Sequence, residues 1–182
     1  MILCREGTVS NPAGLNPEIQ QVFFECARLF DYGEPNDRAI AIVGAAFLDR
    51  LLAEMLANYF VDNDKESMKL LAPDGPLGQF GARTTACYCL GLIGKTVKLD
   101  LRPVAKVRNR FAHEVRIDFS DPRIKGWCEA LAWHRYSIGE PPLNATTRDL
   151  FQVGVNQLVT YLNGLVGLAR LDRRSLCEHG VV

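Results

Sequence analysis

Residues 37–60, DRAIAIVGAAFLDRLLAEMLANYF, decide the fold of this chain. Apolar side chains recur in this stretch at steps of three and four residues, which is the spacing of one face of an α-helix. They cover well over half of the helix circumference and comprise Ile40, Val43, Phe47, Leu48, Leu51, Leu52, Met55, Leu56 and Tyr59. Asp37 is expected to cap the helix, which is expected to end at about Phe60. A helix with so wide an apolar surface belongs at the centre of a helical bundle.

The polar side of this central helix is narrow. It carries Arg38, Asp49, Arg50 and Glu54. Asp49 could be the buried partner of an arginine such as Arg108, but carboxylates mostly lie on protein surfaces. We therefore predict that Asp49 is a surface carboxylate.

A second long apolar pattern lies between Asp149 and Arg170, where no residue is charged. Its apolar residues form one seam along a helix and comprise Phe151, Val155, Leu158, Leu162, Leu165 and Ala169. The stretch has the length of a membrane span, but it is interrupted by the amides Gln152, Asn156, Gln157 and Asn163. Amides are costly in lipid, so we expect a C-terminal helix that packs lengthwise against others and does not cross a membrane. Close backbone approach to a neighbour would explain its glycines, which are Gly154, Gly164 and Gly167.

The rest of the chain divides into shorter helices separated by proline and glycine. Asn16 and Pro17 predict the cap and first turn of a helix that runs to about Phe30. Further helices are expected over residues 64–71, 79–93, from about 96 to 115, and 121–131. Residues 73–78 form a turn rich in proline and glycine, and Pro103 is expected to kink the fifth helix or to mark its true first turn. Pro141 and Pro142 separate the sixth helix from the last.

These patterns predict an all-α protein, a single-domain bundle of about six to seven helices with long central and C-terminal members. We expect the bundle over residues 16–171, with a loosely ordered lead-in at 1–15 and a C-terminal tail at 172–182. Strand-like alternation of apolar and polar residues occurs only briefly, at 115–119. The length of 182 residues is sufficient for one complete hydrophobic core.

The charge balance makes direct DNA binding unlikely. Lys and Arg number 21, and so do Asp and Glu, so the chain has no overall positive field with which to bind a phosphate backbone. The balance is uneven, because residues 95–125 hold nine Lys or Arg against four Asp or Glu. A solvated helix face accounts for this local excess as well as a binding surface does. No helix-turn-helix with a basic second helix is evident.

The six cysteines indicate neither a metal site nor a disulfide framework. They stand at positions 4, 26, 87, 89, 128 and 177, without a CxxC pair or histidines at zinc-ligand spacing. No apolar signal core follows the first few residues, so we expect a cytoplasmic protein with reduced thiols. No cofactor is indicated, because the turn at 73–78 lacks the spacing of a phosphate-binding loop.

The sequence RNRFAH, residues 108–113, is the candidate functional site. Arg108 is permanently charged and can hold a phosphate or carboxylate, and His113 titrates near neutral pH. Asn109 and His113 share one face of the expected helix, whereas Arg108 lies about 140° away from His113 around the axis. The buried stripe of that helix is expected to comprise Val104, Val107, Phe111 and Val115.

Three roles are open for these polar residues. In a structural role, Arg108 bonds helix-terminal carbonyls or a carboxylate, and His113 caps the helix end. In a binding role, Arg108, Asn109, Arg110 and His113 form a site for a partner or ligand. In a catalytic role, two chains pair along this face, His113 transfers a proton to or from a ribose 2′-hydroxyl, and Arg108 and Asn109 hold the phosphate without a metal.

The arginine and histidine of this run resemble the RxxxxH motif of HEPN-type domains, which are helical bundles that include dimeric ribonucleases. A longer resemblance is to the mannitol operon repressor family. It rests on AAFLDRLL at 45–52, GPLGQFGAR at 75–83, LGLI at 90–93, RNRFAH at 108–113 and FSDPRI at 119–124. These segments span about half of the chain in the order in which they occur in the family.

The second resemblance implies a helical transcriptional regulator without a recognised DNA-binding module. Such a protein would control a sugar-alcohol operon through contact with another regulatory or transport protein, and it would not be an enzyme. A homodimer is compatible with it. The alternative is a metal-independent HEPN-like ribonuclease that acts as a dimer.

Overall fold

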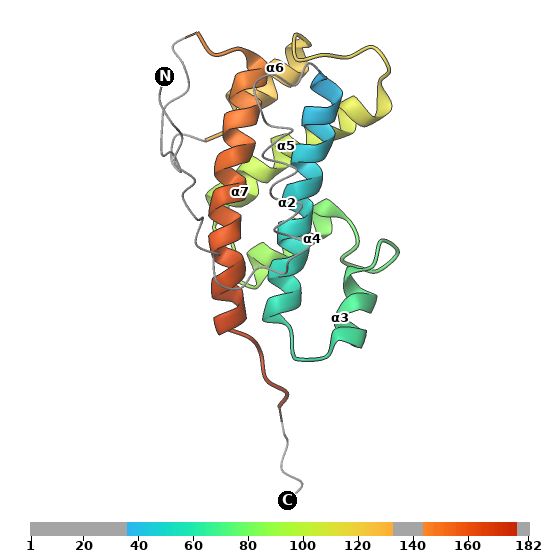
Figure 1. Ribbon diagram of the computed structural model, residues 1–182, viewed down its shortest axis with the longest axis vertical. Helices are drawn as coiled ribbons and strands as arrows, with labels where there is room; N and C mark the ends of the chain where they lie inside the picture. The colour runs from blue at the N-terminus through green and yellow to red at the C-terminus, as the bar shows by residue number, and fades with distance from the viewer. Residues whose placement is uncertain (1–35, 133–143, 178–182) are drawn as a thin grey trace, which may run out of the picture.

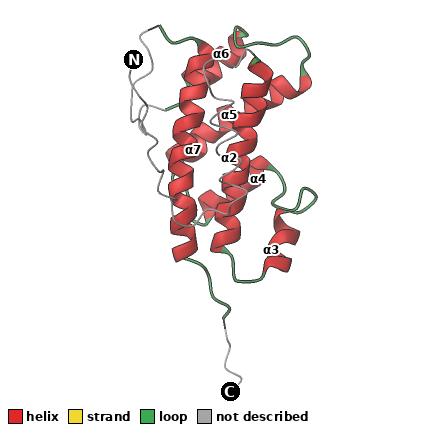
Figure 2. Cartoon of the chain, in the orientation of Figure 1, coloured by secondary structure: helices red, strands yellow, loops and turns green. Residues whose placement is uncertain are grey.

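The computed structural model describes residues 36–132 and 144–177, and every regular element in that part of the chain is a helix (Figure 2). The predicted all-α fold is therefore confirmed. The predicted helix at 16–30 and the prolines at 141 and 142 lie outside the described residues. The helices are α2 (Asp37–Tyr59), α3 (Asp64–Leu71), α4 (Phe80–Cys89), α5 (Lys95–His113), α6 (Pro122–Glu129) and α7 (Thr147–Leu171).

The long helices α2 and α7 lie side by side and run in the same direction (Figure 1). Both ends of the pair are tied by polar contacts. Asp37 pairs with Arg148 at 3.1 Å at one end, and Asn58 donates to the Val166 carbonyl at 3.5 Å near the other. The shorter helices α4, α5 and α6 complete the bundle around this pair.

The core forms where the apolar faces of α2, α5 and α7 meet. The α2 side chains predicted to face inward are buried, apart from Val43 and Tyr59, which are partly buried. In the α7 seam all residues are buried except Leu165, which lies at the edge of the core. Burial of one Leu, Ile or Phe side chain contributes about 1.5–3 kcal/mol, so this seam is a major source of stability.

Asn36, and not Asp37, caps the start of α2. Its Oδ1 accepts hydrogen bonds from the backbone N–H groups of Arg38 and Ala39, at 3.0 and 3.2 Å. Asp37 is the first helical residue, and its carboxylate accepts from the Phe119 N–H at 3.3 Å in addition to pairing with Arg148. The predicted cap was therefore wrong by one residue, because a long-range partner takes the Asp37 side chain.

Asp49 is an ion-pair partner and not a free surface carboxylate. Its Oδ2 lies 2.6 Å from Nη1 of Arg83, which is 11% exposed. Arg83 also donates through Nε to the Leu77 carbonyl and through Nη2 to the Leu71 carbonyl, each at 2.8 Å. One arginine of α4 thus fastens the end of α3 and the following turn to α2. The sequence did not reveal this pair because Arg83 lies 34 residues from Asp49, and no local pattern links residues that far apart.

The turn between α3 and α4 is as tight as its composition predicts. A Cβ atom on Gly75 would lie 2.3 Å from the Lys69 carbonyl oxygen, and one on Gly78 would lie 2.3 Å from that of Ala72. Such distances are below any tolerated contact, so both positions require glycine.

Helix α4 ends at Cys89, four residues before the predicted end at Ile93. Gly91 adopts a left-handed conformation with φ +76°, which ends the helical path. Gly94 is the N-cap of α5 instead of the terminator of α4. The next helix continues through Pro103 from Lys95 to His113, so Pro103 does not mark its first turn.

Val115 does not belong to the buried stripe of α5. The helix ends at His113, and the Val115 side chain is 90% exposed. Phe119 takes the inward position instead, with its ring centroid 5.0 Å from that of Phe111 and 5.4 Å from that of Phe151. The brief alternation at 115–119 forms an irregular segment and not a strand.

Helix α6 begins as predicted, with Asp121 as its N-cap and Pro122 in the first turn, and ends at Glu129. Close approach explains only one of the three α7 glycines. A Cβ atom on Gly154 would lie 2.9 Å from Cδ1 of Leu131, whereas Gly164 and Gly167 face open space.

Candidate functional site

The candidate site lies at the end of α5, where the starts of α2 and α7 and the segment 114–121 come together (Figure 1). The exposed groups of this region are held by a layer of polar contacts beneath them. The residues of the RNRFAH run divide between the exposed groups and the layer of polar contacts beneath them.

Arg38 of α2 caps the C-terminus of α5. Its guanidinium donates to the carbonyl oxygens of Phe111, Glu114 and Val115, with distances of 2.6 Å to Glu114 and 2.9 Å to Val115. The last carbonyls of a helix have no partner within the helix, and a cation there also interacts favourably with the helix dipole. The structural role that the sequence suggested for Arg108 or His113 is therefore performed by Arg38.

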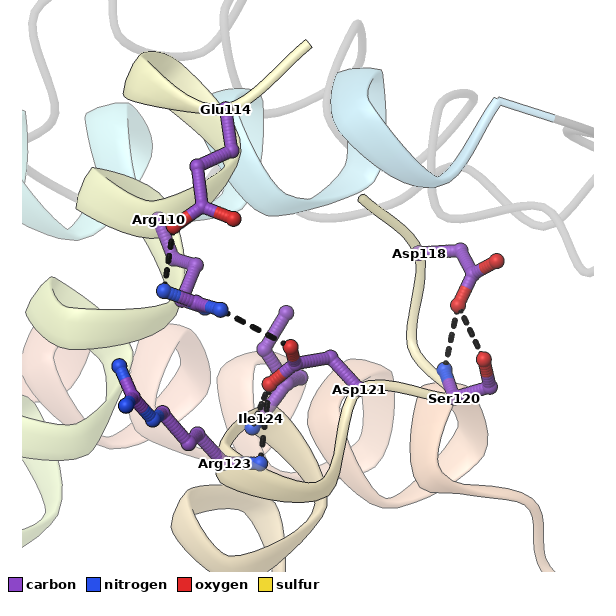
Figure 3. Close-up of polar contacts among 7 residues, drawn as sticks. All are labelled: Arg110, Glu114, Asp118, Ser120, Asp121, Arg123 and Ile124. Carbon is purple, nitrogen blue, oxygen red and sulfur yellow. Dashed lines mark hydrogen bonds and ion pairs between the residues drawn. The ribbon is translucent and has the colours of Figure 1, made fainter. Parts of the chain in front are cut away.

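Arg110 holds the segment after α5 against α6 (Figure 3). Its Nη1 pairs with Glu114 Oε1, and its Nη2 lies 3.0 Å from Asp121 Oδ2. Asp121 also caps α6, because its Oδ1 accepts from the N–H groups of Arg123 and Ile124 at 2.9 and 3.1 Å. Arg110 thus engages two carboxylates of its own chain, and these contacts do not test its predicted place among the partner-contact residues.

This network shifts the protonation of its members. The hydrogen bond from Arg110 lowers the pKa of Asp121, assisted by the α6 N–H groups that donate to the same carboxylate. The hydrogen bond to Asp121 in turn raises the pKa of Arg110. Nearby, the Ser120 hydroxyl and N–H both donate to Asp118 and lower its pKa (Figure 3). Arg110, Asp118 and Asp121 keep their charges at neutral pH, so the ion pair between Arg110 and Asp121 holds the end of α5 against the start of α6 throughout that pH range.

The other three residues of the predicted site face solvent. Arg108 and Asn109 are exposed, and Arg108 Nη1 donates to Asn109 Oδ1 at 2.9 Å. His113 is exposed at the last position of α5 and makes no hydrogen bond or ion pair within the described part of the chain. Arg108 is thus held by its neighbour Asn109, and no hydrogen bond joins Arg108 to His113 within the described residues.

The solvent-facing side of α5 is basic along its length. Lys95, Lys98, Arg102 and Lys106 recur on it, whereas the one acidic residue of the helix, Asp100, is buried and accepts from the Ala132 N–H at 3.0 Å. Lys98 lies over the Tyr88 ring, 4.0 Å from its centroid, and Lys106 lies 5.7 Å from that of Trp127. Four of the nine basic residues at 95–125 thus lie on one face of α5.

Neither metal ligation nor membrane insertion has support in residues 36–132 and 144–177. No three His, Cys, Asp or Glu side chains in these ranges lie close enough together to share an ion. None of the described helices combines the length and the apolar character needed to span a bilayer. Burial raises the pKa of the Cys87 and Cys128 thiols to about 12, so neither acts as a nucleophile at neutral pH.

Sequence reasoning missed the supporting residues Asp37, Arg38 and Arg148. It placed Arg38 on the polar side of α2 but not beneath the candidate site, because its partners lie more than 70 residues away. One signal could have indicated that a cation lies at the end of α5. The last carbonyl groups of a helix have no hydrogen-bond donor within the helix, so they need donors from elsewhere. No local pattern identifies which cation supplies them.

The sequence matches no protein-family model, and no curated protein matches it. Its fold is found in a solved structure, the X-ray structure of the MtlR–HPr complex from Escherichia coli. The MtlR chain superposes with a TM-score of 0.57 at 20% sequence identity, over 83% of this chain and 99% of that one. MtlR is a mannitol operon repressor, so the fold expected from the sequence resemblance is confirmed.

Proposed function

We propose that this chain is a cytoplasmic transcriptional regulator that acts by binding another protein, and that the partner is HPr or a protein with the same binding surface. The observation that carries the proposal is the shared fold, which extends over nearly the whole of MtlR, a protein crystallised in complex with HPr. Because the match covers 99% of the MtlR chain, the surface of MtlR that contacts HPr belongs to the shared fold and not to a separate module.

The proposed contact surface is the exposed end of α5, formed by Arg108, Asn109 and His113. These side chains offer hydrogen-bond donors and acceptors to a partner while the helix beneath them is held by Arg38 and Arg110. A surface on a fixed helix loses little conformational entropy on binding, which favours affinity. Arg110 has a positioning role in this proposal because its guanidinium is taken by Glu114 and Asp121.

Binding to another protein is favoured over binding to an operator. The chain has no net charge, and its exposed basic residues on α5 are too few to neutralise the many phosphates that a duplex presents. A gel-shift assay at physiological ionic strength is therefore expected to show no sequence-specific complex with DNA.

The direct test is calorimetric titration of the purified chain with purified HPr. We expect a saturable complex, and we expect the double variant Asn109→Ala/His113→Ala to weaken it about 10-fold or more, as loss of central interface side chains does. Lys65→Ala is the matched control, because Lys65 is exposed on α3 and away from the end of α5. Equal affinities for the double variant and the control would remove the α5 surface from the proposal.

A ribonuclease assay separates the regulator from the enzyme alternative. RNA is incubated with the chain in the presence of a chelator, and the experiment is repeated with His113→Ala. We expect no cleavage by either protein, because Arg108 bonds to Asn109 and makes no hydrogen bond to His113 within the described residues. Cleavage that disappears in the variant, together with a dimer in solution, would replace the regulator with a dimeric HEPN-like nuclease.

A further inference from the structure

A hollow between α4 and α5 lies apart from the proposed partner surface. Its volume is about 310 Å³, and the residues that shape it include Phe80 and Gly81 of α4 and Lys98, Leu101 and Arg102 of α5. This volume is at the lower end of the range for small-molecule sites in proteins. The partly exposed side chain of Phe80 gives the hollow an apolar wall, and Leu101 lies fully buried behind it.

Both charged side chains of the hollow are cations. Lys98 is held beside it by the Tyr88 ring, and Arg102 makes no hydrogen bond or ion pair within residues 36–132 and 144–177. The Thr84 and Thr85 hydroxyls donate to carbonyls of their own helix, Phe80 O at 2.8 Å and Gly81 O at 2.9 Å. No carboxylate lines the hollow, so the site carries positive charge that no protein group balances.

The position of the cations on α5 adds to this imbalance. Lys98, Arg102 and Lys106 follow one another at steps of four residues, and like charges at this spacing destabilise a helix by a few tenths of a kcal/mol per pair. An anion bound between Lys98 and Arg102 would relieve that repulsion. The guanidinium of Arg102 also has the planar donor fork that matches the oxygens of a phosphate or a carboxylate.

We infer that this hollow is a binding site for a small organic oxyanion, a phosphate or carboxylate ester or acid with a compact carbon body. The anionic group would lie between Lys98 and Arg102, and the carbon body against Phe80. A concave site of this volume fits a small molecule, whereas the proposed protein partner contacts the exposed end of α5 at Arg108, Asn109 and His113. The inference is independent of the identity of the protein partner.

The test is a two-dimensional NMR titration of the isotope-labelled full chain with glucose 6-phosphate, glucose, citrate and inorganic phosphate. We expect saturable shifts at the amides of Gly81, Thr85 and Arg102 with glucose 6-phosphate or citrate, and none with glucose. A response to glucose 6-phosphate alone assigns a phosphate ligand, and a response to citrate alone assigns a carboxylate. Shifts with inorganic phosphate that are at least about 10-fold weaker would show that the carbon body contributes to binding.

Three variants locate the site. Arg102→Gln is expected to weaken binding about 10-fold or more, because it removes charge-assisted hydrogen bonds. Lys106→Gln is the matched control, since it removes the same charge from the same helix face outside the hollow, and it is expected to change the affinity less than about 2-fold. Gly81→Glu is expected to abolish binding while the fold is retained, because a Cβ at Gly81 meets nothing within 4 Å and an acidic residue is favoured in the first turn of a helix.

Several outcomes would overturn the inference. The first is an absence of saturable shifts with all three anions, and the second is a set of shifts that map away from α4 and α5. Equal weakening by Arg102→Gln and Lys106→Gln would reduce the site to diffuse attraction along the basic helix face. Since no partner protein is present in these titrations, failure here leaves the HPr experiment unaffected, and failure of that experiment leaves this one unaffected.

Discussion

Replacement of Arg83 by methionine tests whether one side chain fastens the α3–α4 region to α2. Methionine keeps most of the volume of the side chain but removes the ion pair to Asp49 and the hydrogen bonds to the carbonyls of Leu71 and Leu77. Asp49 would then remain with one oxygen deprived of its partner and the other already buried without one. The substitution therefore leaves polar groups unsatisfied, which costs more than the loss of the contacts alone.

The magnitude follows from the number and the exposure of these contacts. A hydrogen bond that involves a charged group contributes about 1.5–3 kcal/mol. The three contacts of Arg83 could therefore contribute more than about 4 kcal/mol together if they were fully buried. The Asp49 side chain is 29% exposed, and water can replace part of what is lost. We expect a decrease of about 3 kcal/mol in the free energy of unfolding, which corresponds to a decrease in Tm of roughly 6–12 °C for a chain of this size.

The assay is urea unfolding followed by far-ultraviolet circular dichroism. Arg123→Met is the matched control, because Arg123 is exposed and its side chain makes no hydrogen bond or ion pair within the described residues. The control is expected to change the stability by less than about 0.5 kcal/mol. If Arg83→Met is no less stable than Arg123→Met, the polar contacts of Arg83 do not hold this part of the bundle and the reasoning is wrong.

Three further predictions concern other parts of the chain. Gly78→Ala is expected to destabilise the protein by at least about 1–3 kcal/mol, because its Cβ would lie 2.3 Å from a carbonyl oxygen. Gly81→Ala is expected to be neutral or stabilising by up to about 1 kcal/mol, and thermal unfolding of both variants compares them. Cys87 and Cys128, whose thiols have pKa values of about 12 and are buried, are expected to remain unmodified by iodoacetamide at pH 8 until the chain unfolds, and mass spectrometry of the digested protein would reveal any earlier labelling. The pKa of Asp121 is lowered in the folded state, so its contribution to stability is present above its ordinary pKa of about 4 and is lost as pH falls through the folded value. The difference in unfolding free energy between the native chain and Asp121→Asn should therefore shrink below about pH 4 in acid unfolding curves. A difference that stays constant with pH would contradict the role assigned to Asp121.

The helices that the sequence predicts best are those whose apolar pattern is long. Residues 37–60 and 149–170 have many turns of consistent spacing, and the structure places α2 and α7 there with their apolar faces in the core. The short helix at Asp64–Leu71 was also predicted correctly, because the proline- and glycine-rich turn at 73–78 marks its end, and the structure adds Asn63 as its N-cap.

The errors occur where an element ends or where a side chain finds a distant partner. The end of α4 depends on the left-handed conformation of Gly91, which the sequence does not reveal. The residues around it, Leu90, Leu92 and Ile93, are compatible with a helix, so the helix was predicted to continue to Ile93. Val115 continues the spacing of the α5 stripe but follows the last helical residue, so the spacing has no structural meaning there. Asp37 and Asp49 could not be assigned because their partners are Arg148 and Arg83, which only the tertiary fold brings near.

The candidate site shows the same limit more clearly. The sequence identified RNRFAH as informative but left its structural and binding roles open. The structure divides the run, because Arg110 belongs to an internal network while Arg108, Asn109 and His113 face solvent. Periodicity places Arg110 on the partly buried side of α5, but the carboxylates that engage it follow the end of the helix, where periodicity no longer applies.

We propose that this fold works by binding a second protein through the exposed end of α5. The measurement that tests it most directly is the titration of the purified chain with HPr, followed by the same titration with Asn109→Ala/His113→Ala. We expect a saturable one-to-one complex that the double variant weakens about 10-fold or more while its unfolding curve is unchanged. Absence of a complex at concentrations up to about 1 mM, with the native chain fully folded, would contradict it.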